Sequence, residues 1–189
     1  MRYRDKWPQY RTWLNRMVIK PARFAEFKKY ASYAIAHKTT YVEIERKTGV
    51  PWFAVAVIHR RENPSFNAYL GNGQPWNRRT TIVPKGRGPF SSFVAGALDA
   101  LHIDGLDKVV PPWPVEKIIY YNEVFNGQGY HNKGLPSAYV WGGTNIQKAG
   151  KYVADGVWDG SVWDTQPGTA GILWMIGHLD ITVNFTRES

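Results

Sequence analysis

Glu62 is the residue of this chain that is best placed, by its type and its spacing, to do acid chemistry. It follows the apolar run at residues 52–58 and precedes a loop rich in glycine and aromatic residues, and no other carboxylate lies between Glu45 and Asp99. If the run is a helix that ends at Glu62, the unpaired carbonyls there disfavour an ionised carboxylate. Partial burial acts in the same direction, so we expect a raised pKa, as a general acid requires.

The local sequence also leaves other outcomes open for this glutamate. Arg60 and Arg61 would lower its pKa if they folded back onto the carboxylate, and a glutamate at a helix end can simply be solvated. The histidines are scattered, and His59 with Glu62 lacks the second histidine of an H-x-x-E-H zinc site. No metal or other cofactor is therefore expected. The absence of cysteine excludes disulfides and thiolate sites.

Helices must position this carboxylate, and hydrophobic periodicity with capping signals predicts a mainly α fold with a small β-hairpin lobe. Residues 1–20 show no clear period and are expected to pack on the domain as a basic segment. Turn signals around the stretch RRTTIVP predict the hairpin lobe over residues 63–90. The predicted helices cover residues 21–38, 40–49 with Thr39 or Thr40 as cap, 51–62, 91–105 with Ser91 or Ser92 as cap, 114–127 and 169–179.

Composition limits the size and the partners of the protein. A chain of 189 residues is expected to form a single domain. Its 24 Lys and Arg residues outnumber 15 Asp and Glu residues, and a net charge of +9 favours polyanionic partners such as nucleic acid, acidic lipid or cell-wall polymers. The 9 Trp, 11 Tyr and 8 Phe residues are a heavy aromatic load, so some rings are expected to serve a surface.

Three ordered blocks of sequence carry a resemblance to a known family. The stretch GVPWFAVAVIHRRENPSFNAYLGNG, continued by QPWNRRTTIVPKGRGPFSSF, resembles the lysozyme-like superfamily, which includes soluble lytic transglycosylases and phage endolysins. The stretches YNEVFNGQGYHNKGLPSAYVWGGTN and GKYVADG are similar to the same group of bacterial and phage peptidoglycan hydrolases. The resemblance covers roughly residues 20–180.

This resemblance implies a two-lobed helical fold with a saccharide groove, formed by one catalytic domain over residues 1–189. It implies that Glu62 protonates the β-1,4 glycosidic oxygen between N-acetylmuramic acid and N-acetylglucosamine in peptidoglycan. It also implies that Tyr121 and Asn122 contact the substrate, which agrees with the way Asn122 interrupts an apolar stripe. A buried asparagine that only holds a loop is the alternative.

A second catalytic group is not evident, because no carboxylate lies between Glu62 and Asp99 where two-carboxylate glycosidases often place one. Related enzymes sometimes carry Asp where this chain has Gln74. Thr80 and Thr81 could position a water for hydrolysis, or the 6-hydroxyl of the substrate could attack and give an anhydro product. Aromatic residues in the flanking loops are candidates for stacking on sugar rings: Phe66, Tyr69, Trp76, Tyr130, Tyr139 and Trp141.

The sequence leaves other functions open. Basic residues interleaved with rings would suit a nucleic-acid-binding module, although that reading leaves Glu62 unexplained. A chitosanase-like or chitinase-like activity is a further alternative. We expect a monomer that binds glycan strands and anionic cell-wall or outer-membrane polymers, with no obligate nucleic acid and no transmembrane segment. Because the start of the chain does not resemble a secretory signal, we expect synthesis in the cytoplasm and action on the wall after holin- or lysis-dependent release.

Overall fold

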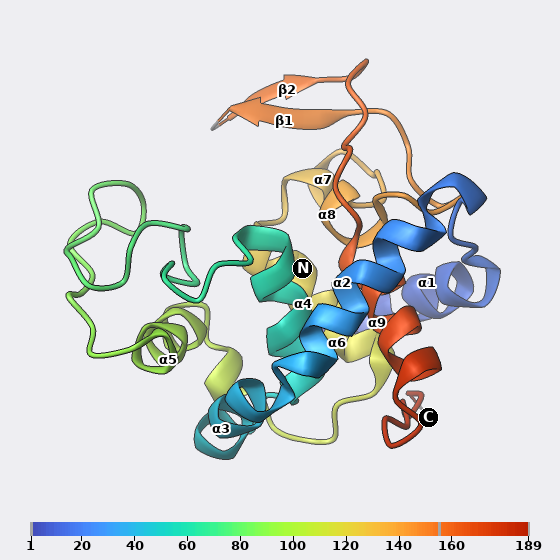
Figure 1. Ribbon diagram of the computed structural model, residues 1–189. Coiled ribbons are helices and arrows are strands. Elements are labelled where there is room, and N and C mark those ends of the chain that lie inside the picture. The colour runs from blue at the N-terminus through green and yellow to red at the C-terminus, as the bar shows by residue number, and fades with distance from the viewer. Residues whose placement is uncertain (1, 155, 189) are drawn as a thin grey trace. The chain divides into compact units, whose positions relative to one another are not determined.

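The computed structural model describes residues 2–154 and 156–188, and this part of the chain is mainly helical, with one small two-stranded antiparallel sheet (Figure 1). The predicted fold class is therefore confirmed. The chain divides into two compact units, of which unit 1 contains Met1–Tyr33 and Trp113–Ser189 and unit 2 contains Ala34–Pro112. The boundary lies inside helix α2 (Phe24–Ala36).

Helix α4 (Trp52–Glu62) is the buried centre of unit 2. Every residue from 54 to 58 is buried, as an apolar run without a polar face predicts, and the burial continues beyond that run through His59, Arg60 and Arg61. Helix α4 packs on α3 (Lys38–Thr48), and α3 also packs on α5 (Phe93–Ile103) and on the 3-10 helix η2 (Leu106–Lys108). Each fully buried Val or Ile of α4 contributes about 1.5–3 kcal/mol through removal of its side chain from water.

The helix ends of unit 2 follow local signals in part. Gly49 ends α3 in the left-handed region at φ 73°, and the Ser92 hydroxyl accepts the Ala95 amide at 3.1 Å to cap α5. The prediction that Thr39 or Thr40 caps α3 is wrong. Helix α3 begins at Lys38, so both threonines lie inside its first turn.

The predicted β-hairpin over residues 63–90 is also wrong, because this segment forms turns, bends and one isolated bridge. Side chains occupy the backbone groups that a strand ladder would use. The Gln74 Oε1 atom accepts the Thr81 amide at 2.7 Å, and the Thr80 hydroxyl accepts the Arg87 amide at 3.0 Å. The prolines of the segment have no N–H group to donate to a ladder.

Unit 1 is built on helix α6 (Val115–Asn126), which packs against α1 (Tyr3–Arg16), α8 (Ala138–Trp141) and α9 (Thr169–Leu179). Helix α9 has the predicted bounds. The short helices α7 (Gly129–Asn132) and α8 lie within a stretch that was expected to be a loop, and the 3-10 helix η1 (Pro21–Arg23) precedes α2. Trp141 of α8 is fully buried, with its ring 5.5 Å from that of Trp13 in α1.

The sheet lies in unit 1, where strands β1 (Lys151–Ala154) and β2 (Val157–Asp159) pair antiparallel beside α7 and α8 (Figure 1). The Tyr152 and Trp158 rings pack edge to face against each other and against Tyr130 of α7, with centroids 5.1–5.8 Å apart. The sequence signal for this hairpin is a DG pair between two short runs of β-branched and aromatic residues.

Helix α1 was not expected, because the basic residues 1–20 show no clear period and Pro8 interrupts the helical pattern. Tertiary contacts favour this helix over its local signals. The Tyr10 side chain is fully buried, and its hydroxyl donates to the Glu123 carboxylate of α6 at 2.5 Å. Pro8 lies inside the helix beyond its first turn, where its missing N–H group costs a helical hydrogen bond that the tertiary contacts offset.

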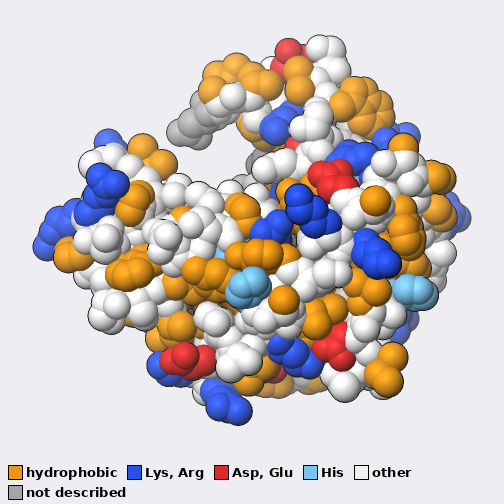
Figure 2. Space-filling view, in the orientation of Figure 1, with side chains coloured by type: hydrophobic (Ala, Val, Ile, Leu, Met, Phe, Trp, Pro, Cys, Tyr) orange, Lys and Arg blue, Asp and Glu red, His pale blue; other side chains and the backbone are white. Residues whose placement is uncertain are grey.

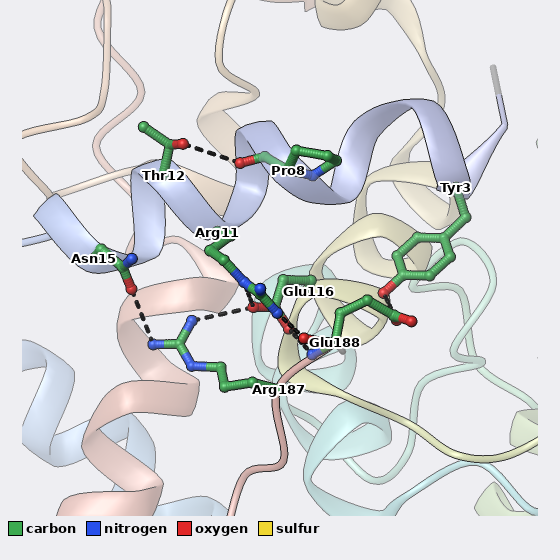
Figure 3. A network of polar contacts seen from close by, with 8 residues as sticks. All are labelled: Tyr3, Pro8, Arg11, Thr12, Asn15, Glu116, Arg187 and Glu188. Carbon is green, nitrogen blue, oxygen red and sulfur yellow. Dashed lines mark hydrogen bonds and ion pairs between the residues drawn. The ribbon is translucent and has the colours of Figure 1, made fainter.

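The C-terminal segment is held on α1 and α6 through the fully buried carboxylate of Glu116 (Figure 3). This carboxylate accepts hydrogen bonds from Arg11 and Arg187 at 3.2 Å each and from the Glu188 amide at 3.0 Å. Burial alone would raise the pKa of Glu116, but these donors and the two guanidinium groups hold it below its usual range. Tyr3 and Arg11 also bond to Glu188, which ties the segment to α1.

Candidate functional site

Glu62 is the last residue of α4 and is half-buried. The three residues before it, His59, Arg60 and Arg61, are all buried, so the helix end lies within packed side chains. The backbone continues into Asn63 in an extended conformation, and the Asn63 amide donates to the His59 carbonyl at 3.1 Å. The carboxylate therefore lies beside the negative end of a helix whose backbone position is fixed. The raised pKa expected from this position stays a prediction.

His59 fixes the loop that follows Glu62. Its Nδ1 atom lies 2.8 Å from the Tyr41 hydroxyl, and its Nε2 atom lies 3.2 Å from the Ser65 carbonyl oxygen. A carbonyl can only accept, so Nε2 carries the proton and Nδ1 accepts from the phenol. Burial lowers the pKa of His59 to about 4, so the ring stays neutral near pH 7 and keeps both bonds.

Asn63 fixes the same loop from the other side of Glu62. Its Oδ1 atom accepts the Ser65 amide at 3.0 Å, and its Nδ2 atom donates to the Gly73 carbonyl at 3.3 Å. Neither His59 nor Asn63 is a predicted site residue. The sequence signal that could have identified them is their position, with His59 one helical turn before Glu62 and Asn63 directly after it.

Phe66 serves the core of unit 2. Its ring centroid lies 4.8 Å from that of His59, 4.8 Å from that of Phe93 and 5.8 Å from that of Tyr41. Its carbonyl accepts the indole N–H of Trp76 at 2.8 Å, so these two predicted site residues lie together. Phe66 and Trp76 are both half-buried.

Tyr69 also has a structural role. It is buried, stacks on Phe90 at 5.2 Å, and donates its hydroxyl to Asp99 at 2.8 Å. Arg87 bonds to the same carboxylate, with Nε at 3.0 Å from Oδ2. Burial and the bond to Asp99 raise the pKa of Tyr69 above its usual range. A ring packed in this way cannot stack on a sugar.

The two candidate threonines differ in what their hydroxyls can do. The Thr80 hydroxyl is buried, donates to the Pro84 carbonyl at 2.5 Å and accepts the Arg87 amide, so its donor and its acceptor are both in use. The Thr81 hydroxyl is exposed and accepts from Gln74 Nε2 at 2.9 Å, which leaves its own hydrogen for a water. Thr80 therefore holds the loop, and Thr81 is the better candidate to position a water.

Asn122 is the unusual polar residue of unit 1. Its side chain is 1% exposed, and neither Oδ1 nor Nδ2 has a hydrogen-bond partner among the residues that the structure describes. Leaving a buried donor or acceptor unpaired costs about 1–3 kcal/mol, so such a group requires an explanation, such as a bound water or ligand. Tyr121 beside it is half-buried and packs edge to face on Trp113 at 5.6 Å.

The other ring candidates of unit 1 are core residues. Tyr130, Tyr139 and Trp141 are 5%, 4% and 0% exposed. A ring needs an open face to stack on a sugar, and these rings pack on protein instead. Their placement in loops on sequence grounds was misleading, because the short helices α7 and α8 bury them.

Glu123 is a buried carboxyl that the sequence analysis missed. It is 3% exposed, its Oε2 atom accepts the Tyr10 hydroxyl, and burial raises its pKa above the usual range of a glutamate despite this bond and the nearby charge of Lys6. The sequence signal that could have predicted its burial is its position one turn after Ile119, in the inward stripe of α6. Because protein atoms surround this carboxyl, it joins α1 to α6 and is not available to a polymeric substrate.

Some kinds of site are not found in the described parts of the chain. Over residues 2–154 and 156–188, no three His, Asp or Glu side chains form a group that could hold a metal ion. None of the helices described there is long and apolar enough to cross a membrane. The chain matches no protein-family model, no curated protein and no solved structure.

The raised pKa of Glu123 predicts a pH dependence of stability. The folded state binds the proton of Glu123 more tightly than the unfolded state, so its contribution is fully present below the unfolded pKa of about 4.5 and is lost as pH rises through the folded pKa. We expect the stability of Glu123→Gln relative to the wild type to increase as pH is raised from about 4 to about 8. Urea unfolding, measured at intervals of about one pH unit, gives this difference.

Tyr10→Phe provides the complementary variant. It removes the hydrogen bond that lowers the pKa of Glu123, so its stability should fall more steeply over the same pH range than that of the wild type. A stability difference between Glu123→Gln and wild type that is constant with pH would contradict the assignment of a buried, protonated carboxyl.

Proposed function

We propose that this protein is a glycoside hydrolase that cleaves the β-1,4 bond between N-acetylmuramic acid and N-acetylglucosamine in peptidoglycan, with Glu62 as general acid. The observation that carries the proposal is the position of Glu62 at the end of the buried helix α4, with both neighbouring segments held by His59 and Asn63. A general acid must keep its proton near pH 7 and its position to within a fraction of an ångström. Helix-end carbonyls and partial burial favour the first requirement, and the fixed loop favours the second.

The reaction begins with transfer of the Glu62 proton to the glycosidic oxygen as the bond from that oxygen to C1 breaks. The positive charge that develops on the sugar ring is relieved by a nucleophile that adds to C1 and loses a proton. In hydrolysis the nucleophile is a water, and the Thr81 hydroxyl is the group on this chain that we assign to hold it. In transglycosylation it is the 6-hydroxyl of the same sugar. In either case the Glu62 carboxylate, which gave up its proton in the first step, accepts the proton that the nucleophile loses.

The contact between Asn122 and substrate stays a prediction. Its amide is as enclosed as the Glu123 carboxyl, at 1% exposure, so a buried water is the partner that this position favours. Chitin carries N-acetyl groups as peptidoglycan does, so a chitinase-like activity is tested in parallel.

The nucleic-acid alternative rests on the net charge of +9 and on basic residues interleaved with rings. On the face shown in Figure 2, Lys and Arg side chains lie among apolar and uncharged ones. This alternative gives Glu62 no role, so the glycosidase activity is tested first.

The first test replaces Glu62 by Gln, which keeps the shape of the side chain and removes its acidic proton. We expect the rate of cleavage of purified peptidoglycan to fall about 100-fold or more, as loss of a general acid predicts. Release of soluble fragments measures the rate. Glu45→Gln, at a half-buried glutamate of α3 in the same unit, is the matched control and should cleave at the wild-type rate. Full activity of Glu62→Gln would reject the proposal.

The second test concerns the buried amide of Asn122. Replacing it in Asn122→Leu removes no hydrogen bond within the described protein, so we expect stability within about 1 kcal/mol of wild type, or higher, and cleavage at the wild-type rate. Asn145→Leu is the control, because Asn145 accepts from the Val18 amide and donates to the Arg16 carbonyl, both at 2.8 Å. This control should lose about 1 kcal/mol per bond. Urea unfolding and fragment release measure the two effects. A loss of cleavage by the folded Asn122→Leu variant would show that the substrate reaches this amide.

The third test identifies the nucleophile. Mass spectrometry of the fragments distinguishes reducing ends, which contain one added water, from anhydro ends. We expect reducing ends, and we expect Thr81→Val to slow their formation while Thr81→Ser, which keeps the hydroxyl, does not. Anhydro ends would assign the same bond cleavage to a lytic transglycosylase.

A further inference from the structure

Unit 1 has a hollow of about 200 Å³ whose lining side chains are apolar. Met17, Val18 and Ile19 line it from the segment that follows α1, Phe24 lines it from the start of α2, and Trp174 lines it from the middle of α9. Trp174 is far along the chain from the other four residues, so the hollow is a feature of the tertiary structure. It contains none of the residues assigned to the proposed catalytic site.

The side chains around this hollow are unusually exposed for their type. Val18 is 60% exposed, Phe24 is 43% exposed and Trp174 is 44% exposed. One exposed apolar side chain is ordinary in a soluble protein, but several around one hollow indicate an interaction surface. The Trp174 indole stacks on the His178 imidazole at 5.1 Å with an interplanar angle of 8°, which restrains the exposed ring.

Positive charge surrounds the apolar lining. Arg16 directly precedes Met17, Lys20 directly follows Ile19, and Lys28 lies one helical turn after Phe24 on the same face of α2. Arg16 and Lys28 form no ion pair with any carboxylate of the described residues.

The acidic groups close to this rim do not neutralise it. The Glu26 carboxylate is bound by Arg23 at 2.6 Å, and α9 contains no acidic residue. The Lys20 ammonium lies over the ring of Trp163 at 4.7 Å, and Trp163 is itself 50% exposed. The surface therefore combines exposed aromatic and aliphatic side chains with cations that no carboxylate offsets.

We infer that this surface of unit 1 binds the surface of an anionic lipid bilayer. Apolar side chains enter the boundary between headgroups and acyl chains, while Arg and Lys side chains bind the anionic headgroups, and Trp is a residue that prefers this boundary. The charge of the rim selects an anionic partner, and the apolar side chains of the lining select one that presents hydrocarbon. Of the polyanions that suit a chain of charge +9, a lipid bilayer has both properties.

Vesicle sedimentation with the full chain tests this inference. We expect the protein to sediment with vesicles of phosphatidylcholine and phosphatidylglycerol, to bind weakly to vesicles of phosphatidylcholine alone, and to be released in part at high salt. Arg16→Gln with Lys28→Gln should weaken binding about 25-fold, because each cation near an anionic surface contributes about a fivefold factor. Arg78→Gln with Lys85→Gln, which removes the same charge from exposed positions of unit 2, should weaken it much less.

The apolar part of the surface has its own pair of variants. Trp174→Ser with Phe24→Ser should weaken binding to the anionic vesicles at least about tenfold, since two large rings no longer enter the bilayer. Ile82→Ser with Val83→Ser removes exposed apolar side chains from unit 2, at 51% and 75% exposure, and should leave binding unchanged. Circular dichroism and urea unfolding establish that each variant is folded.

Three results would overturn the inference. The first is failure of the wild-type protein to bind anionic vesicles. The second is undiminished binding by the folded Trp174 and Phe24 variant, which would leave only nonspecific attraction of charge. The third is a wild-type dimer in sedimentation that Trp174→Ser dissociates, which would assign the surface to a second copy of the chain. These readouts do not depend on catalysis, so they stand or fall separately from the proposed glycosidase activity.

Discussion

A neutral imidazole at the end of helix α4 is the interaction on which the candidate site depends. His59 is buried, and each of its ring nitrogens has a partner of the opposite kind, a phenol on α3 and a carbonyl in the loop after α4. Protonation would turn Nδ1 into a donor, and the Tyr41 hydroxyl would have to turn to accept from it. The low pKa of His59 keeps this arrangement over the physiological range. Glu62 lies one turn later, so the same two bonds of His59 fix the backbone on either side of it.

Helix α6 shows three different ways of burying a polar side chain. The Glu116 carboxylate is charged and is satisfied by two guanidinium groups and a backbone amide (Figure 3). The Glu123 carboxyl has one phenol as its hydrogen-bond partner, and burial favours its neutral form. The Asn122 amide between them in the stripe has no partner in the described protein. The first two hold α1 and the C-terminal segment in place, and the third is a buried amide whose hydrogen bonds the described protein does not satisfy.

The aromatic residues divide in a way that composition could not reveal. Most rings in the candidate loops are packed on other rings, as Phe66 is on His59 and Phe93, and Tyr69 is on Phe90. Trp76 and Tyr121 remain half-buried and keep part of their surface. A different group, with Phe24, Trp163 and Trp174, is exposed in unit 1 beside cations. Many of the aromatic residues therefore pack in the cores of the two units, and another group forms part of an exposed apolar surface of unit 1.

The sequence by itself determined the elements whose information is local. The apolar run of α4, the Ser92 cap, the left-handed Gly49 and the bounds of α9 follow from side-chain periodicity and backbone preference, which act over a few residues. It also identified Glu62 at a helix end and Asn122 in an apolar stripe. Only tertiary structure decided the remaining features, because they depend on partners distant in the chain. Helix α1 forms despite Pro8 because Tyr10 reaches Glu123, and residues 63–90 form no hairpin because Gln74 and Thr80 take the backbone amides that a ladder needs.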